Sequence, residues 1–247
     1  MVSGKRIAAA RLLAAAGLAF GLAGNAAAQG LYANAAPIPE EDQGAWNAVG
    51  RLNQAGWNER QMCTATLVAP DKVLTAAHCV YDFRTGKPSR PSEVHFVAGW
   101  RGGPFAAHRK GAQIRLHPDY DPGAPPEATR THSDLAIMTL DTPIPDEIAQ
   151  PIPADVAPGE HEAILLVGYR RDRPHLPSLY DACPVTWRGQ MSYAVKCRVI
   201  EGSSGGPVVA LRGGEKRVVG VISSYVVMHP TIGTRVAVPK LEMLLNE

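Results

Sequence analysis

The sequence contains no C-x-x-C pair, no H-E-x-x-H motif and no basic run interleaved with aromatic residues. The first two patterns are common signatures of zinc sites, and the third is typical of many nucleic-acid-binding proteins. We therefore expect no metal site and no nucleic-acid partner.

Long hydrophobic runs are almost absent. The one such run, Leu12–Gly24, follows the basic segment Lys5–Arg11 and precedes the small residues Ala26–Ala28. This order is typical of a secretory signal peptide, with cleavage after Ala28. A retained anchor is the alternative, but the run is too short to span a bilayer comfortably. We expect residues 1–28 to be a signal peptide and the mature chain to be secreted or periplasmic, with no membrane segment.

A strong charge of one sign is also missing. The chain has 25 basic and 23 acidic residues, and three of the basic ones lie in the expected signal peptide. The mature chain would be nearly neutral, so the positive charge of the full sequence is no argument for a nucleic-acid partner.

Cysteine is scarce, with four residues at positions 63, 79, 183 and 197. In an exported protein an even number of cysteines favours disulfides, here two. Four cysteines allow three pairings, and the sequence alone does not choose among them.

Short apolar and β-branched runs recur along the chain, separated by turns that use many of its 21 Pro and 24 Gly. This spacing predicts an all-β barrel or sandwich and disfavours an α/β fold. One helix is expected, over Pro239–Asn246, with Pro at its first position. Residues 29–41 lack periodicity and are interpreted as a short pro-segment or an N-terminal arm. The expected strands are Trp46–Leu52, Cys63–Val68, Val94–Trp100, Ala112–Leu116, Leu135–Leu140, Ala163–Tyr169, Pro207–Leu211, Arg217–Ser223 and Thr234–Val238.

Three short motifs carry the chemistry. Leu74–Cys79 puts a His beside a Cys after an apolar run, Gly202–Pro207 puts a Ser in a glycine-rich turn, and Asp134 opens an apolar run. A Ser hydroxyl becomes a strong nucleophile when an imidazole accepts its proton, and a carboxylate can hold the other ring N–H. Backbone N–H groups of the turn can then stabilise an oxyanion.

The chain order His78, Asp134, Ser204 and the residues around each position resemble the chymotrypsin/trypsin family of serine endopeptidases. Thr75–Cys79 match the family pattern T-A-A-H-C in full, and Asp134–Ile137 resemble D-L-A-L. Of the pattern G-D-S-G-G-P, only Ser203 departs. The resemblance covers about residues 42–247.

The resemblance implies an all-β fold of two packed six-stranded antiparallel β-barrels followed by a short C-terminal helix. The N-terminal barrel, residues 42–150, would carry His78 and Asp134. The C-terminal barrel, residues 151–247, would carry Ser204 and end in the helix.

The resemblance also implies roles for these residues. Ser204 would be the nucleophile, His78 the general base and Asp134 its orienting carboxylate, with the N–H groups of Gly202 and Ser204 as the oxyanion hole. The substrates would be proteins or peptides, and the mechanism requires neither a metal nor an organic cofactor. We expect a monomer. The implied disulfide Cys63–Cys79 would hold His78 in place, which leaves Cys183–Cys197 as the second.

Rival assignments exist for two positions. Ser203 is the nearest alternative nucleophile, and Asp119 and Asp121 are alternative carboxylates that lie near prolines. The residues around Ser204 also satisfy G-x-S-x-G, the nucleophile turn of α/β-hydrolases, in which Asp and His follow the Ser. Because the 43 residues after Ser204 contain no Asp, that fold is excluded by chain order.

The departure at Ser203 bears on maturation. In the digestive and clotting members, an Asp at this position pairs with a new N-terminus, and Ser203 cannot form that ion pair. The N-terminal arm also lacks a basic residue followed by Ile-Val. The resemblance is therefore closer to the bacterial secreted branch, which includes glutamyl endopeptidases, and we expect no activation by an inserted Ile N-terminus.

Side-chain specificity is the least determined property. Substrate backbone is expected to add as a strand against Ser223–Tyr225. Arg198 would repel Lys and Arg side chains and could favour acidic ones with help from Arg235, or it could point to solvent or pair with Glu201. The His that marks the acid pocket of glutamyl endopeptidases would fall near Ile222, so that support is missing. When the chain is aligned with the family's motifs, the residues expected to line the primary pocket are Arg198, Val199, Ser223, Ser224, Tyr225 and Gly233.

Two other functions fit the same motifs. A secreted binding protein could use a protease fold without catalysis, because a fold does not dictate function. A serine esterase could use the same three side chains. Because no catalytic residue type is missing, the sequence argues against a non-catalytic protein, and a comparison of peptide and simple ester substrates would separate an esterase from an endopeptidase.

Overall fold

The computed structural model describes residues 1, 35–54, 61–124, 131–181, 183–228 and 231–238. The expected signal peptide and the helix expected at Pro239–Asn246 lie outside these residues. No helix within the described ranges is long and apolar enough to cross a membrane.

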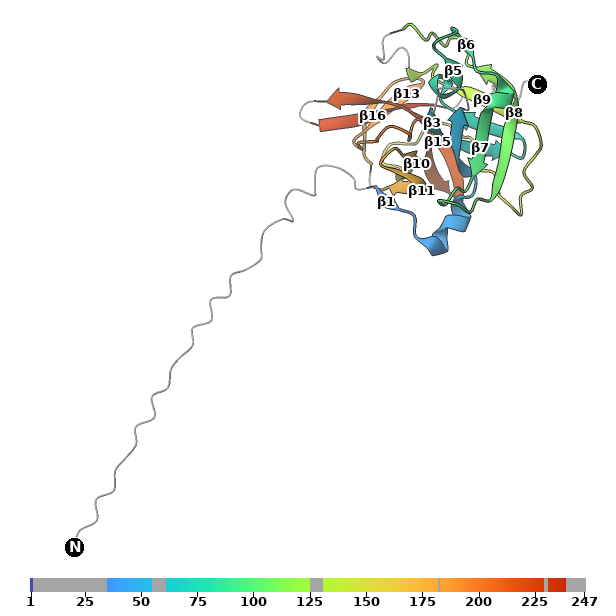
Figure 1. Cartoon of the computed structure of the whole chain (residues 1–247). Coiled ribbons are helices and arrows are strands. Elements are labelled where there is room, and N and C mark those ends of the chain that lie inside the picture. Colours follow the sequence, from blue (N-terminus) through green and yellow to red (C-terminus); the bar gives the residue numbers. More distant parts are fainter. Residues whose placement is uncertain (2–34, 55–60, 125–130, 182, 229–230, 239–247) are drawn as a thin grey trace. The chain divides into compact units, whose positions relative to one another are not determined.

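Six strands of the N-terminal half form a closed antiparallel barrel in the order β2-β3-β4-β9-β8-β7 (Figure 1). Their bounds are β2 Val49–Gln54, β3 Met62–Ala69, β4 Lys72–Thr75, β7 Val94–Ala98, β8 Ala107–Leu116 and β9 Ala136–Leu140. Alternation of buried and half-buried residues in β7 shows the period of two that a one-sided strand requires. The barrel expected for this half is confirmed.

The C-terminal half forms one eight-stranded sheet in the order β1-β11-β10-β14-β15-β16-β13-β12. The bounds are β1 Ala36–Pro37, β10 Ile164–Arg170, β11 Arg173–Tyr180, β12 Val185–Arg188, β13 Ser192–Val195, β14 Pro207–Arg212, β15 Glu215–Met228 and β16 Thr231–Ala237.

This sheet differs from the expected closed barrel of six strands, although the all-β, trypsin-like class is confirmed. It has eight strands instead of six, and no strand ladder closes it into a barrel among the described residues. The short segment 181–184 connects β11 to β12, and the Lys196 N–H donates to the Pro184 carbonyl over 2.8 Å. The disulfide Cys183–Cys197 fastens the same corner.

Seven strands were not expected from the sequence: the two-residue strands β1, β5 (Tyr81–Asp82) and β6 (Lys87–Pro88), and the longer strands β4, β11, β12 and β13. The clearest case is β11, which contains Pro174 and Pro177. Proline cannot donate to a strand ladder and is therefore confined to edge strands or bulges. At one end of the sheet only the two-residue β1 lies outside β11, and the register of β11 with β10 shifts next to Pro177.

Short elements complete the chain. They are the 3₁₀ helices η2 Glu40–Trp46, η3 Ala77–Val80 and η4 Pro91–Glu93, and the two-stranded sheet of β5 Tyr81–Asp82 and β6 Lys87–Pro88. Of the segment interpreted as a pro-segment or arm, residues 35–41 are described. Ile38 is buried, and its N–H donates to the Pro177 carbonyl over 3.1 Å.

The barrel and the eight-stranded sheet share an apolar core. The cluster that fills the barrel continues into the second half through Val167, Tyr169 and Val209, while a second cluster around Tyr180 and Tyr193 fills the inside of the sheet. This shared burial holds one side of the sheet against the barrel.

Polar contacts between the halves converge on Thr64 in β3. Its N–H donates to the Ser204 carbonyl and its hydroxyl donates to the Gly202 carbonyl, each over 2.8 Å. The same hydroxyl accepts the Tyr169 N–H over 2.8 Å. A barrel strand thereby holds the glycine-rich turn of the other half in place.

Candidate active site

The pairing of β4 with β9 brings His78 and Asp134 together. Thr75 at the end of β4 lies opposite Ala136 at the start of β9. His78 follows β4 in η3, and Asp134 precedes β9 by two residues, so both lie at the same end of the barrel. Neighbouring strands are about 5 Å apart, which puts the two side chains within contact distance.

The carboxylate of Asp134 receives three hydrogen bonds. His78 provides two, from its backbone N–H to Oδ1 over 3.0 Å and between Nδ1 and Oδ2 over 2.8 Å. The Ser223 hydroxyl donates the third to Oδ2 over 2.6 Å. Asp134 is 2% exposed, and this burial alone would raise its pKa, but the charge of His78 and these hydrogen bonds outweigh burial and hold the pKa below its ordinary value. The carboxylate therefore stays charged.

The rival carboxylates lie in other surroundings. Asp119 is largely exposed, with a carboxylate oxygen 3.8 Å from His117 Nδ1, and Asp121 accepts the Gly123 N–H in a turn. Within the described residues, neither carboxylate contacts His78.

The turn around Ser204 depends on two glycines. Gly202 has φ +94° and Gly205 has φ +80°, a region that L side chains rarely adopt. A Cβ on Gly202 would lie 2.4 Å from Met62 Cε and 2.7 Å from the Tyr169 carbonyl. Only glycine fits this position without displacing its neighbours.

Backbone hydrogen bonds leave two N–H groups of the turn unused. Ser203, Gly205 and Gly206 each donate their N–H to a carbonyl, at 3.0, 2.7 and 2.9 Å. Within the described part of the chain, neither Gly202 N–H nor Ser204 N–H donates. Unused N–H groups beside a hydroxyl are the donors that an oxyanion hole requires.

The two adjacent serines have different environments. Ser203 is fully buried, with its hydroxyl 3.3 Å from that of Tyr180. Ser204 is half-buried, and its hydroxyl donates to the Ser223 carbonyl over 3.4 Å. Substrate can reach only the second hydroxyl, which argues against Ser203 as the nucleophile.

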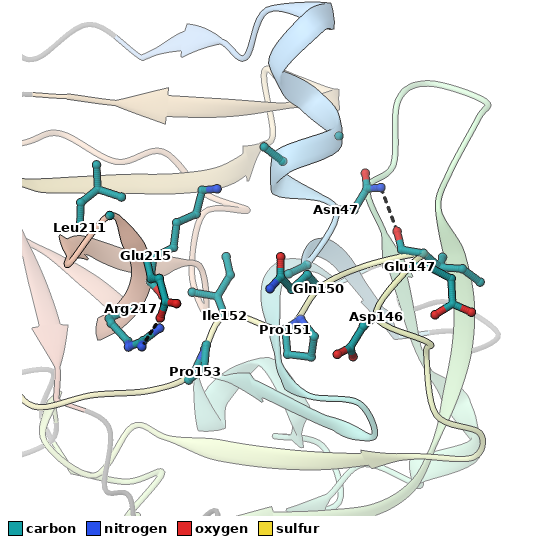
Figure 2. Close-up of a pocket in the computed structure, with 16 residues that line it drawn as sticks. Asn47, Asp146, Glu147, Gln150, Pro151, Ile152, Pro153, Leu211, Glu215 and Arg217 are labelled. Atoms are coloured by element: carbon teal, nitrogen blue, oxygen red, sulfur yellow. Dashed lines mark hydrogen bonds and ion pairs between the residues drawn. The ribbon is translucent and has the colours of Figure 1, made fainter.

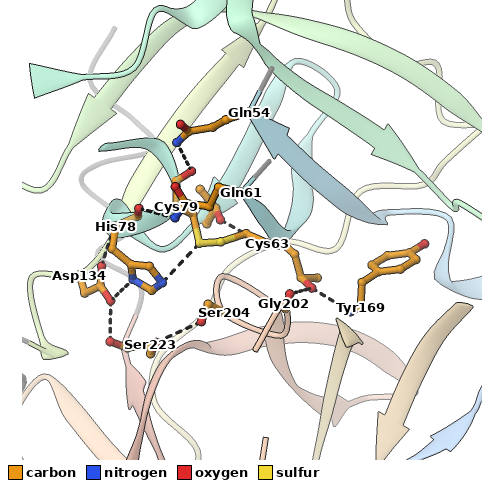
Figure 3. The surroundings of a disulfide bond; sticks show 12 residues. Gln54, Gln61, Cys63, His78, Cys79, Asp134, Tyr169, Gly202, Ser204 and Ser223 are labelled. Carbon is orange, nitrogen blue, oxygen red and sulfur yellow. Dashed lines mark hydrogen bonds and ion pairs between the residues drawn. A yellow bond between two sulfur atoms is a disulfide. The ribbon is translucent and has the colours of Figure 1, made fainter. Parts of the chain in front are cut away.

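Ser223 in β15 connects the whole site. Its hydroxyl contacts Asp134 and its carbonyl contacts Ser204, so one residue joins the carboxylate to the serine (Figure 3). His78 Nε2 lies 3.6 Å from Cys79 Sγ, and among the described contacts it forms no hydrogen bond with Ser204. In structures without substrate, catalytic hydrogen bonds are often long or misaligned.

Both implied disulfides are present in the structure. Cys63–Cys79 joins the start of β3 to the residue after His78, with Cα atoms 6.0 Å apart. The two sulfurs and His78 form the one cluster of three potential metal-ligating residues in the described part of the chain. Because a disulfide sulfur has no thiolate to offer, this cluster does not suit a metal ion.

The residues expected in the primary pocket have mixed exposure. Ser223 and Gly233 are buried, Val199 and Ser224 are half-buried, and Arg198 and Tyr225 are exposed. Glu201 forms its ion pair with Arg171, so the alternative pairing with Arg198 is not observed. Arg235 lies opposite Ser224 in the ladder, and its Nε is buried with no partner among the described residues.

A separate groove, of about 540 Å³, is lined by other residues (Figure 2). It lies between η2, the connector 146–153 and the β14–β15 turn, and Asn47, Asp146 and Arg217 are among its lining residues. None of the expected site residues lines it, so volume alone would misplace the site.

Sequence reasoning missed Thr64 and Tyr180, and it expected Ser223 to contact substrate but not Asp134 or Ser204. Thr64 follows Cys63 directly, but threonine in a strand carries no local signal of contact with a turn 138 residues away. The roles of Thr64 and Ser223 exist only once the two halves are in contact, and that of Tyr180 depends on a contact with Ser203, 23 positions away.

Comparison with known proteins agrees with this geometry. Residues 38–239 match the family model described as Trypsin. The chain is 27% identical over 187 residues to the trypsin of Saccharopolyspora erythraea, covering 66% of this chain and 75% of that protein. It is 30% identical over 126 residues to the cercarial protease of Schistosoma mansoni, covering 46% of each.

Two solved structures share the fold at 18% sequence identity. A Glu endopeptidase aligns with a TM-score of 0.69 over 87% of this chain and 96% of its own. The thermostable serine protease AL20 from an extremophilic microorganism aligns with a TM-score of 0.62 over 79% and 92%. The family match over 38–239 and these shared folds show that the chain belongs to the trypsin family and is a serine endopeptidase.

Proposed function

We propose that this endopeptidase cleaves peptide bonds through an acyl-enzyme formed on Ser204. The observation that carries the proposal is the continuous path Ser204–Ser223–Asp134–His78, which ends on an imidazole held by a buried, charged carboxylate. A hydroxyl, an imidazole and a carboxylate gathered at one site are the parts of a serine nucleophile and its base.

In the proposed first step, the Ser204 hydroxyl rotates from the Ser223 carbonyl toward His78 Nε2. Its oxygen attacks the scissile carbonyl while its proton passes to Nε2, and Asp134 stabilises the imidazolium without taking a proton. The N–H groups of Gly202 and Ser204 receive the oxyanion. His78 then protonates the leaving amine, which departs and leaves an ester on Ser204.

In the second step, water repeats the sequence on the ester. His78 accepts a proton from the water, the hydroxide attacks the acyl carbon, and the proton returns to Ser204 as the carboxylic acid leaves. Every proton transfer is internal to the site and the water, so the mechanism uses no metal or organic cofactor.

We further propose that the chain works outside the cytoplasm. Two disulfides favour an oxidising compartment. A peptide substrate with Lys or Arg before the cleaved bond is expected to be poor, because Arg198 is exposed and has no ion-pair partner among the described residues.

The test compares Ser204→Ala with Ser203→Ala in the mature chain. Ser204→Ala should abolish both peptide hydrolysis and labelling by a fluorophosphonate, whereas Ser203→Ala should keep labelling because its hydroxyl is buried against Tyr180. Labelling that persists in Ser204→Ala would refute the proposed nucleophile. Rates on peptides and on simple esters separate an endopeptidase from an esterase.

A further inference from the structure

Strand β15 is paired on one side for only part of its length. It has 14 residues, and β14 covers it from Glu215 to Val221. One more residue is held by the turn, because Ile222 exchanges hydrogen bonds with Gly205 and Gly206. From Ser223 to Met228, no strand of the described chain pairs with this side.

The other side of this part of β15 is paired with β16. The pairing runs from Val221 to Met228, where Met228 lies opposite Thr231, and its register shifts between Ile222 and Ser224, so Ser223 has no partner in β16 and the regular alternation begins after Ile222. In Figure 1 the end of β15 runs alongside β16, the red strand labelled at the left. The free side therefore belongs to a strand that is held in an extended conformation by its pairing with β16.

The direction of the backbone groups follows from the register. The Ser223 carbonyl faces the Ser204 hydroxyl, so this carbonyl lies on the free side. Successive residues of a strand alternate, so Tyr225 and Val227 present their N–H and C=O groups on the same side.

The far end of the β15–β16 pair gives the same directions. Met228 and Thr231 are separated by two residues, and the closing pair of such a hairpin exchanges its backbone hydrogen bonds, so Met228 faces β16. By alternation Val226 also faces β16, which leaves Tyr225 and Val227 facing the free side.

We infer that this edge binds five residues of an extended substrate on the acyl side of the cleaved bond, with the fifth residue paired to Val227. This inference rests on the proposed function of Ser204. An antiparallel substrate strand whose first residue faces Ser223 places its third residue at Tyr225 and its fifth at Val227. From Ser223 to Val227 the edge spans about 13 Å at the usual rise per residue.

The substrate class follows from this length. A peptide segment must be extended for at least five residues before the cleaved bond, as unfolded chains and flexible linkers are. Short peptides forgo two backbone hydrogen bonds at Val227, which is expected to lower kcat/KM roughly tenfold. Tight turns and helices cannot bind this edge without unfolding.

The experiment uses acetylated peptides that share the first three residues preferred in a cleavage library and extend to three, four, five or six residues. We expect kcat/KM to rise from three to four residues, because the acetyl carbonyl of the four-residue peptide occupies the position of the fifth residue's carbonyl, and to rise again from four to five, because the fifth residue adds its N–H. N-methylation of the fifth residue should remove that gain, and N-methylation of the fourth should not, because its N–H points away from β15. Equal effects of the two methyl groups, or no gain at the fifth residue, would overturn the inference.

Two further measurements separate this inference from the proposed function. Val227→Pro removes an N–H on the free side only, so it should lower kcat/KM of the five-residue peptide more than that of the three-residue peptide. Binding of the same peptides to Ser204→Ala, followed by fluorescence anisotropy, should give the same ranking without turnover. Failure of Ser204 as nucleophile would appear as persistent fluorophosphonate labelling of Ser204→Ala, whereas failure of the edge would appear as flat length dependence.

Discussion

Thr64 offers the sharpest test of how the two halves form one site. Thr64→Val replaces the hydroxyl with a methyl of similar size and keeps the backbone N–H that donates to Ser204. Two buried groups then lose their partner, the Gly202 carbonyl and the Tyr169 N–H. An unsatisfied buried group costs about 1–3 kcal/mol, so we expect the free energy of unfolding to fall by about 2–4 kcal/mol.

The matched control lies two residues further along the same strand. Thr66 is 1% exposed, and its hydroxyl has no partner among the described residues. Thr66→Val therefore removes a buried polar group without taking a hydrogen-bond partner from another group, and we expect the free energy of unfolding to be unchanged or slightly higher. Both variants bury the same side chain, so the comparison isolates the hydrogen bonds.

Urea denaturation at neutral pH measures the difference, with Tm as a second readout. For a chain of this size, 2–4 kcal/mol corresponds to a fall in Tm of roughly 5–15 °C. The Gly202 carbonyl fixes the turn that presents the proposed oxyanion donors, so kcat of Thr64→Val should also fall while that of Thr66→Val does not. Equal unfolding midpoints for the two variants would refute the role assigned to Thr64.

Three further predictions concern the proposed catalytic machinery. Asp134→Asn should lower kcat by about 10⁴. The pKa of Asp134 is lowered in the folded state, so its charged form contributes stability above the ordinary pKa of about 3.9, and this contribution is lost as pH falls below that value. The difference in the free energy of unfolding between wild type and Asp134→Asn should therefore narrow from pH 7 to pH 3. A difference independent of pH would contradict this. Gly202→Ala should lower kcat at least about 10²-fold, and Gly213→Ala, whose Cβ would meet nothing within 4 Å, should leave kcat unchanged. Arg198→Glu should raise kcat/KM for peptides with Lys before the cleaved bond relative to Glu, and an unchanged ratio would place Arg198 outside the pocket.

The chemistry-bearing residues could be found from the sequence because their environments are local. His78 adjoins a strand end and a cysteine, Ser204 lies between glycines that the turn requires, and Asp134 opens a buried strand. The all-β class followed in the same way from short apolar runs with frequent turns. The strands with prolines or few apolar residues, such as β11, were missed because their pairing comes from neighbours in the sheet and not from their own pattern.

The sequence by itself determined which residue types are available, in which order, and that the fold is built from strands. Only the tertiary structure decided that Thr64 holds the Ser204 turn, that Ser223 joins Ser204 to Asp134, and that Ser203 is buried against Tyr180. It also decided that the second half is an eight-stranded sheet with a long free edge along β15. Each of these contacts joins residues at least 19 positions apart or depends on which strands become neighbours. Burial and register between distant segments set such contacts, and neither is encoded in any single stretch of sequence.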